Sequence, residues 1–182
     1  MVNADDFYGA GSFVQLAIFL KKSLPLKFSK PEFAMVGFRL GKTLSEHGAV
    51  SRGVCTVDVK GYLRDVEETT GILAAEVGTG PSAKYAPETQ VSMNCWGFTS
   101  EFLPHLHERW LAFLKEHGSS EKTEFYLPFA VNDLLKASTI RVHVLPTESE
   151  WFGVTYREDK PRVQAAINAL VAKGEYPSPL WK

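Results

Sequence analysis

Hydrophobic positions along the chain follow two periods, one typical of helices and one typical of strands. Apolar residues at helical spacing predict helices at 11–23, 103–117 and 160–173, and a shorter one around 132–136. Strand-like segments lie at 32–40, 49–57, 62–70, 89–98, 139–145 and 151–156. Residues 58–61 predict a hairpin turn between the second and third of these strands. Because helices and strands are intermixed, the pattern predicts an α/β protein, and residues 1–182 suit a single domain.

Three finer expectations follow from the same pattern. The helix at 11–23 is apolar on nearly all sides, which is typical of a buried helix. Thr99 or Ser100 is expected to cap the helix that follows. Arg52 could bind a phosphate through two hydrogen bonds, yet strand alternation directs it outward, so a surface role is at least as consistent.

Composition narrows the classes of function. Hydrophobic residues make up 45% of the chain and charged residues 23%, which is ordinary for a soluble protein. Twenty basic and twenty-one acidic side chains give a net charge of −1, which argues against binding to nucleic acid or to an anionic membrane. The longest apolar run, 13–20, is too short to span a membrane, and no signal peptide is visible. Two cysteines are too few for a disulfide framework, so we expect a cytoplasmic protein.

The segment from Asn3 to Gly9, with the sequence NADDFYG, is the sharpest local feature. Asp5 and Asp6 follow what could be the end of a strand and precede a helix, and open α/β sheets bind ligands at the carboxyl ends of strands. Carboxylates there are well placed to hold Mg²⁺, which prefers oxygen ligands. A solvated helix N-terminus would favour the same residues, and the local pattern somewhat favours that interpretation.

Five further segments accompany this motif in a fixed order: 51–55 (SRGVC), 91–98 (VSMNCWGF), 124–128 (EFYLP), 144–147 (VLPT) and 151–156 (WFGVTY). Together they resemble the sugar-1-phosphate nucleotidyltransferases, in the branch of that family that carries the NADDFYG motif. The resemblance covers nearly the whole chain. It implies a Rossmann-like mixed sheet flanked by helices, the nucleotide-diphospho-sugar transferase fold. It also implies Mg²⁺-dependent transfer of a nucleotidyl group from a nucleoside triphosphate to a sugar 1-phosphate, with release of pyrophosphate.

The resemblance assigns roles to individual residues. Asp5 matches the catalytic, metal-binding aspartate of the family, and the adjacent Asp6 is a weaker metal candidate. Glu68 resembles the glutamate of the family's Glu-Lys-Pro sugar-binding strand, although threonines follow it here in place of lysine and proline. Asn94 falls where relatives often have a glycine near the sugar, and its amide could bind sugar hydroxyls.

Two departures from the family pattern remain. The second metal-binding aspartate has no direct counterpart; Asp159 could replace it, although a helix-capping role is favoured. The family's glycine-rich loop and its triphosphate-binding arginine and lysine precede the Asp motif, whereas only four residues precede Asp5 here. The resemblance therefore implies an N-terminally truncated, C-terminal part of the domain, completed by an N-terminal partner or assembled as a homo-oligomer. The alternative is an inactive remnant that binds a sugar phosphate or serves as an oligomerising module.

Overall fold

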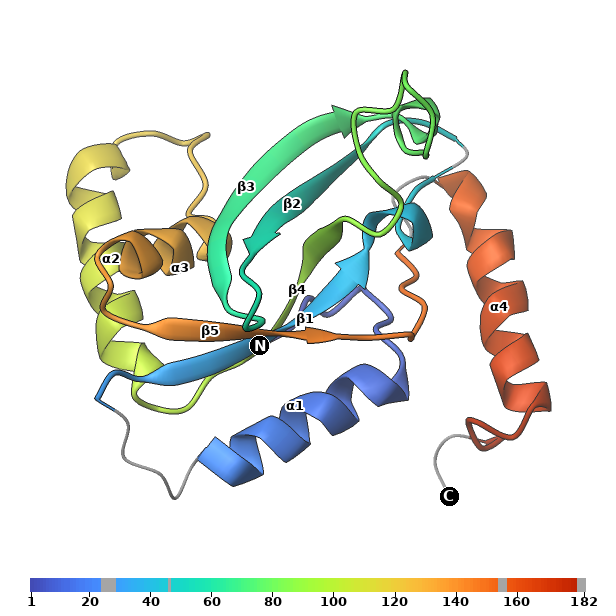
Figure 1. Cartoon of the computed structure of the whole chain (residues 1–182), viewed down its shortest axis with the longest axis horizontal. Coiled ribbons are helices and arrows are strands. Elements are labelled where there is room, and N and C mark those ends of the chain that lie inside the picture. The colour runs from blue at the N-terminus through green and yellow to red at the C-terminus, as the bar shows by residue number, and fades with distance from the viewer. Residues whose placement is uncertain (24–28, 46, 154–156, 180–182) are drawn as a thin grey trace.

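The computed structural model describes residues 1–23, 29–45, 47–153 and 157–179. Its centre is a five-stranded mixed sheet flanked by helices, so the predicted α/β class is confirmed (Figure 1). The strands run in the spatial order β3-β2-β4-β1-β5. Their bounds are β1 Glu32–Arg39, β2 Val50–Val57, β3 Leu63–Ile72, β4 Gln90–Gly97 and β5 Arg141–Pro146.

The sheet combines two kinds of pairing. Strand β1 pairs antiparallel with β4 and parallel with β5, and β2 pairs antiparallel with both β3 and β4. The predicted hairpin between β2 and β3 forms around Asp58, whose Oδ1 accepts the N–H groups of Lys60 and Tyr62 at 2.9 Å. Val144 of β5 donates its N–H to the carbonyl of Gly61 at 2.8 Å. The hairpin turn therefore reaches the outer edge of β5, and the sheet is curled.

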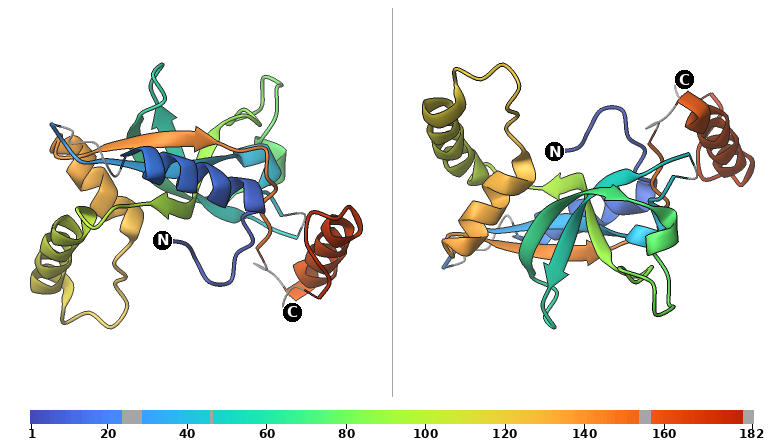
Figure 2. Two further views of the ribbon diagram at one scale, coloured as in Figure 1. Left: turned by 90° about the horizontal axis from the view of Figure 1, so that it is seen from below. Right: turned by 90° about the horizontal axis from the view of Figure 1, so that it is seen from above.

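In the described part of the chain, four α-helices flank the sheet: α1 Ala10–Ser23, α2 Phe102–His117, α3 Leu127–Lys136 and α4 Lys160–Ala172. Alternation along β1 separates two apolar clusters, because successive side chains of a strand point to opposite faces. Ala34, Val36 and Phe38 pack with Leu16 of α1, whereas Phe33 and Met35 pack with residues of α2 and α3. Helices α2 and α3 lie at one end of the sheet and α4 at the other (Figures 1 and 2).

Helix α1 is not buried all round, so that prediction was wrong. Only Ser12, Leu16 and Ser23 are buried among its residues. The outward apolar side chains of Phe13, Val14 and Ile18 are 47%, 56% and 48% exposed. Among the described residues, the outer side of α1 is therefore largely exposed, although the ring of Phe13 still meets that of Tyr8 edge-on with centroids 6.1 Å apart.

Two other boundaries differ from expectation. Helix α2 begins at Phe102, whose N–H binds the carbonyl of Thr99 at 3.1 Å, and no side-chain cap forms. In place of a strand at 151–156, the structure shows a single bridge between Phe152 and Phe7, and residues 154–156 lie outside the described residues.

No helix in the described part of the chain combines the length and apolar character needed to cross a membrane.

The aromatic core beneath α2 and α3 gives a direct test of this packing. Phe33 is fully buried, with ring centroids 5.4 Å from those of Phe98 and Phe102. We expect Phe33→Ala to lower the free energy of unfolding by about 3–5 kcal/mol, because it removes buried surface and leaves a cavity. The matched change Phe13→Ala, on the exposed side of α1, should cost less than about 1 kcal/mol. Urea unfolding measures both, and equal losses would contradict the assignment of the core.

Candidate functional site

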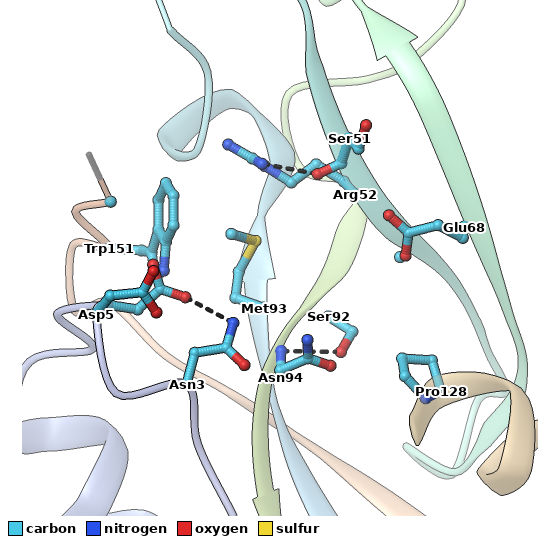
Figure 3. Close-up of a pocket in the computed structure, with 13 residues that line it drawn as sticks. Asn3, Asp5, Ser51, Arg52, Glu68, Ser92, Met93, Asn94, Pro128 and Trp151 are labelled. Carbon is cyan, nitrogen blue, oxygen red and sulfur yellow. Dashed lines mark hydrogen bonds between the residues drawn. The ribbon is translucent and has the colours of Figure 1, made fainter. Parts of the chain in front are cut away.

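A cavity of about 230 Å³ opens where several parts of the chain converge (Figure 3). Its walls come from the N-terminal segment, strands β2, β3 and β4, the start of α3 and the segment 151–153. Asp5, Asp6, Glu68 and Asn94 all line it, so the structure brings together these four residues that the sequence singled out. The other lining residues are Asn3, Ser51, Arg52, Gly53, Ser92, Met93, Pro128, Trp151 and Gly153.

Asp6 is the more firmly held of the two adjacent carboxylates. Asn3 donates its side-chain amide to Oδ2 of Asp6 at 2.9 Å. The hydroxyl of Tyr8 lies 3.2 Å from the same oxygen and 2.8 Å from the carbonyl oxygen of Met93 on β4. Burial raises the pKa of Tyr8, so the hydroxyl keeps its proton and remains a donor. Asp6 is thus oriented by neighbours, whereas Asp5 is exposed at the mouth of the cavity.

A short bridge between distant parts of the chain places Trp151 in the cavity wall. Phe7 and Phe152 exchange two backbone hydrogen bonds of 2.9 and 3.0 Å, and their rings stack with centroids 5.4 Å apart. Gly153 lies against this indole: a Cβ atom there would be 2.3 Å from Cη2 of Trp151 and 3.0 Å from Oδ1 of Asp6. The absence of a side chain at Gly153 therefore lets Trp151 lie beside Asp6.

Arg52 is buried rather than outward, so its predicted surface role was wrong. Its guanidinium carbon lies 4.8 Å from the ring centroid of Trp151. Burial lowers the pKa of Arg52 to about 10, while the charges of Asp6 and Glu68 oppose this shift. In the ladder between β2 and β3, Arg52 stands opposite Thr69, one of the two threonines that replace Lys-Pro in the resembled motif.

Glu68 reaches the same cavity from β3. Its side chain is half-buried, and burial raises the pKa of its carboxyl group. The positive charge of Arg52 opposes that shift without overcoming it. Glu68 is therefore held where a ligand hydroxyl would be a better partner than bulk water.

Asn94 enters the cavity through an unusual backbone conformation. Its φ is +59°, in the left-handed region that residues other than glycine seldom adopt. It lies where the pairing of β4 with β1 shifts register, between Trp96 and Ser92. Trp96 donates its indole N–H to Oδ1 of Asn94 at 3.4 Å. Such strain is concentrated at ligand sites, where the surrounding structure stabilises it.

Asp159 is not brought together with Asp5 and Asp6. It is buried at the start of α4, where Ser45 donates its hydroxyl to Oδ1 at 3.4 Å. Basic side chains from His47 and Arg162 approach the same oxygen at 3.9 and 4.0 Å. Asp159 is absent from the residues that line the cavity. These contacts place Asp159 between α4 and the segment after β1, outside the cavity lining that contains Asp5 and Asp6.

The donor set at Asp5 and Asp6 fits Mg²⁺ in part. In the described part of the chain, no group of three His, Cys, Asp or Glu side chains is close enough to hold a metal ion. Mg²⁺ often binds through one or two carboxylates and takes its remaining ligands from water and substrate phosphates. The two adjacent aspartates would provide the one or two carboxylate ligands that such a site needs. Without water and substrate phosphates, they would not complete the coordination of the ion.

Sequence reasoning assigned two prominent parts of the cavity wall incompletely: Arg52 was weighed between phosphate binding and a surface role, and Trp151 was given no role. Arg52 lies two residues after the buried Val50 with the exposed Ser51 between them, so alternation along β2 directs its side chain inward. Trp151 belongs to the 151–156 motif, but no local signal shows that its segment pairs with Phe7.

In comparisons with known proteins, no family model matches the chain, and a search of curated proteins finds no significant relative.

The left-handed conformation of Asn94 predicts different free energies of unfolding for two small substitutions at this position. Asn94→Gly and Asn94→Ala both remove the amide, but glycine adopts positive φ without steric cost, whereas alanine does not. We expect the glycine variant to exceed the alanine variant by about 1 kcal/mol in the free energy of unfolding. Urea denaturation compares them, and an alanine variant as stable as the glycine variant would contradict the assigned backbone conformation.

The raised pKa of Glu68 predicts a pH-dependent gain in stability for Glu68→Gln. A carboxyl group with a raised pKa binds its proton more tightly in the folded than in the unfolded state, so its ionisation destabilises the fold as pH rises. The glutamine variant should therefore melt at a higher temperature than the parent at pH 7. The difference should vanish below about pH 4, where both states of Glu68 are protonated. Glu67→Gln is the control, and a gap independent of pH would refute the argument.

Proposed function

We propose that this chain forms the metal and sugar side of a sugar-1-phosphate nucleotidyltransferase with a nucleotide-diphospho-sugar transferase fold. The observation that carries the proposal is the gathering of Asp5, Asp6, Glu68 and Asn94 around one cavity from three separate parts of the sequence. The mixed α/β sheet and the order of the resembling motifs support the same proposal.

Each side chain has a role suited to its position. Bound Mg²⁺ would supply charge neutralisation for the phosphates. Asp6, held by Asn3 and Tyr8, would be the fixed carboxylate for that ion, and Asp5 the exposed one beside it. Glu68 would accept hydrogen bonds from sugar hydroxyls, and the amide of Asn94 can both donate and accept. In the reaction, a phosphate oxygen of the sugar 1-phosphate attacks the α-phosphorus, and the bond to the pyrophosphate leaving group breaks.

The size of the cavity agrees with a small ligand. At about 230 Å³ it lies below the range of about 300–1,000 Å³ that is typical of sites for drug-sized ligands. A monosaccharide suits this volume, whereas a nucleoside triphosphate would extend beyond it. The 182 residues contain no glycine-rich loop that opens a helix. We therefore propose that this cavity binds the sugar phosphate and that the triphosphate is bound outside it.

A module without turnover is the second candidate. The exposed apolar side of α1, with Phe13, Val14 and Ile18, favours a role in assembly. Pyrophosphate release from nucleoside triphosphates and sugar 1-phosphates distinguishes the two candidates only when residues that bind the triphosphate are supplied together with this chain. The 182-residue chain should show little turnover on either view, because in-line positioning of the triphosphate dominates this chemistry. Robust turnover once the complementing segment is added would establish the enzyme.

The metal assignment predicts that Mg²⁺ strengthens the binding of a sugar 1-phosphate. We expect at least about a tenfold lower Kd for α-glucose 1-phosphate with Mg²⁺ than with EDTA, because an ion bridge adds a charge-assisted contact of about 1.5–3 kcal/mol. Asp6→Asn should abolish this difference. Isothermal titration calorimetry measures it, and Asp133→Asn, which changes an exposed aspartate of α3, is the matched control. An Mg²⁺ effect that survives in Asp6→Asn would exclude Asp6 as a ligand.

A further inference from the structure

The cavity contains two strong hydrogen-bond donors that the proposed metal and sugar contacts leave unused. One is the guanidinium of Arg52, and the other is the indole N–H of Trp151. In Figure 3 both lie toward the Asp5 side of the cavity, with Glu68 and Pro128 on the opposite side. Neither group can accept a hydrogen bond, so a partner must offer oxygen lone pairs.

The indole N–H of Trp151 is an unsatisfied buried donor. The residue is only 8% exposed, and its Nε1 has no hydrogen-bond partner among the described residues. Leaving a buried donor without an acceptor is unfavourable. In contrast, the indole N–H of Trp96 is bonded to Asn94. The N–H of Trp151 is therefore an unpaired donor in a residue of the cavity wall.

The guanidinium of Arg52 has N–H groups without a hydrogen-bond partner and no carboxylate close to it. Its Nε donates to Oγ1 of Thr43 at 3.1 Å, one terminal nitrogen to the carbonyl of Ser51 at 2.7 Å, and the other to the carbonyl of Thr43. A guanidinium has five N–H groups, so these three contacts leave two free. In the described part of the chain no carboxylate lies within 4.0 Å of it. Its neighbours thus fix its orientation without neutralising its charge.

The balance of charge around the cavity identifies the kind of anion. Three carboxylates, Asp5, Asp6 and Glu68, face one guanidinium. An anion entering alone would be repelled by this excess of negative charge, whereas an anion that arrives with a divalent cation would not. Phosphate is the anion that most often bridges to Mg²⁺ in proteins. Arginine also matches phosphate geometry with parallel N–H groups.

We propose that Arg52 and Trp151 form an oxyanion subsite that binds the phosphate group of the substrate, with Arg52 donating from β2 and Trp151 from the segment paired to Phe7. The subsite itself follows from the donors, and only the identity of its anion as a sugar phosphate rests on the proposed function. The stacking of the guanidinium on the indole, 4.8 Å from the ring centroid, fixes both donors relative to each other. The pair would hold the phosphate beside the metal-binding aspartates.

Indole NMR tests the subsite directly. The probe is inorganic phosphate in the presence of Mg²⁺, and the signal is the Nε1–H resonance of Trp151, identified as the one that Trp151→Phe removes. We expect this resonance to move downfield on titration, because the free N–H gains an acceptor. The resonance of Trp110, on α2 and outside the cavity lining, serves as the internal control. A Trp151 resonance that stays unchanged while phosphate saturates the protein would overturn the proposal.

Two substitutions separate a binding role from a structural one. Trp151→Phe keeps an aromatic ring beside Arg52 but removes the N–H together with part of the indole, and Arg52→Lys keeps the charge but loses the parallel donors. Each should raise the Kd for phosphate about tenfold or more, because a hydrogen bond to a charged group is lost. Trp110→Phe, on the outer part of α2, should leave it unchanged. If the pair only stabilised the fold, the melting temperature would fall without a change in Kd, and the proposal would be wrong.

A parallel titration with α-glucose 1-phosphate and with glucose distinguishes this proposal from the proposed function. If inorganic phosphate binds through the pair but the sugar phosphate binds no more tightly, the subsite stands and the sugar 1-phosphate assignment fails. If the sugar phosphate binds in a manner that requires Asp6 but Trp151→Phe and Arg52→Lys bind it like the parent, the assignment stands and the subsite fails. Glucose, which lacks the phosphate, should bind all three proteins equally.

Discussion

Burial of β1 on both faces is the constraint on which the rest of the fold depends. All but the last of its residues are buried, so each face needs its own apolar cover. Helix α1 provides one and the α2–α3 pair the other. Parallel pairing with β5 also requires a long crossover between the two strands, and that crossover contains β2, β3, β4 and the helices α2 and α3. The sheet order follows from this connection.

The candidate site depends on a second, much smaller contact. Phe7 and Phe152 join segments 145 residues apart in sequence through two backbone hydrogen bonds and a ring stack. That contact sets Trp151 beside the aspartate motif, and the hydroxyl of Tyr8 connects the motif to β4. The cavity is therefore formed by pieces that are each anchored to the sheet, which suits a site that must hold polar groups in fixed directions.

The predictable part of the structure was the part governed by local pattern. Alternating apolar residues located the strands, and the Asp58–Gly61 turn identified the hairpin, because side-chain period and turn chemistry act over a few residues. The burial of α1 was predicted wrongly because apolar residues on all sides of a helix do not show whether a second layer packs over it. Arg52 was assigned to the outer face although it shares one side of β2 with the buried Val50, so that error lay in reading the local pattern. The position of Trp151 depends on a pairing across nearly the whole chain and cannot be predicted from neighbouring residues.

The charges in the cavity connect these observations to chemistry. Burial alone would favour neutral side chains, yet three carboxylates and a guanidinium converge there. Burial raises the pKa of Glu68 and lowers the pKa of Arg52, because desolvation disfavours the charged form of each group and no close ion pair compensates for it. A ligand that carries both a divalent cation and an anionic group would relieve both shifts, since the cation stabilises carboxylates and the anion stabilises the guanidinium. A neutral sugar would relieve neither. This balance of charges supports the proposed metal-bound phosphate ester over a simple carbohydrate as the ligand.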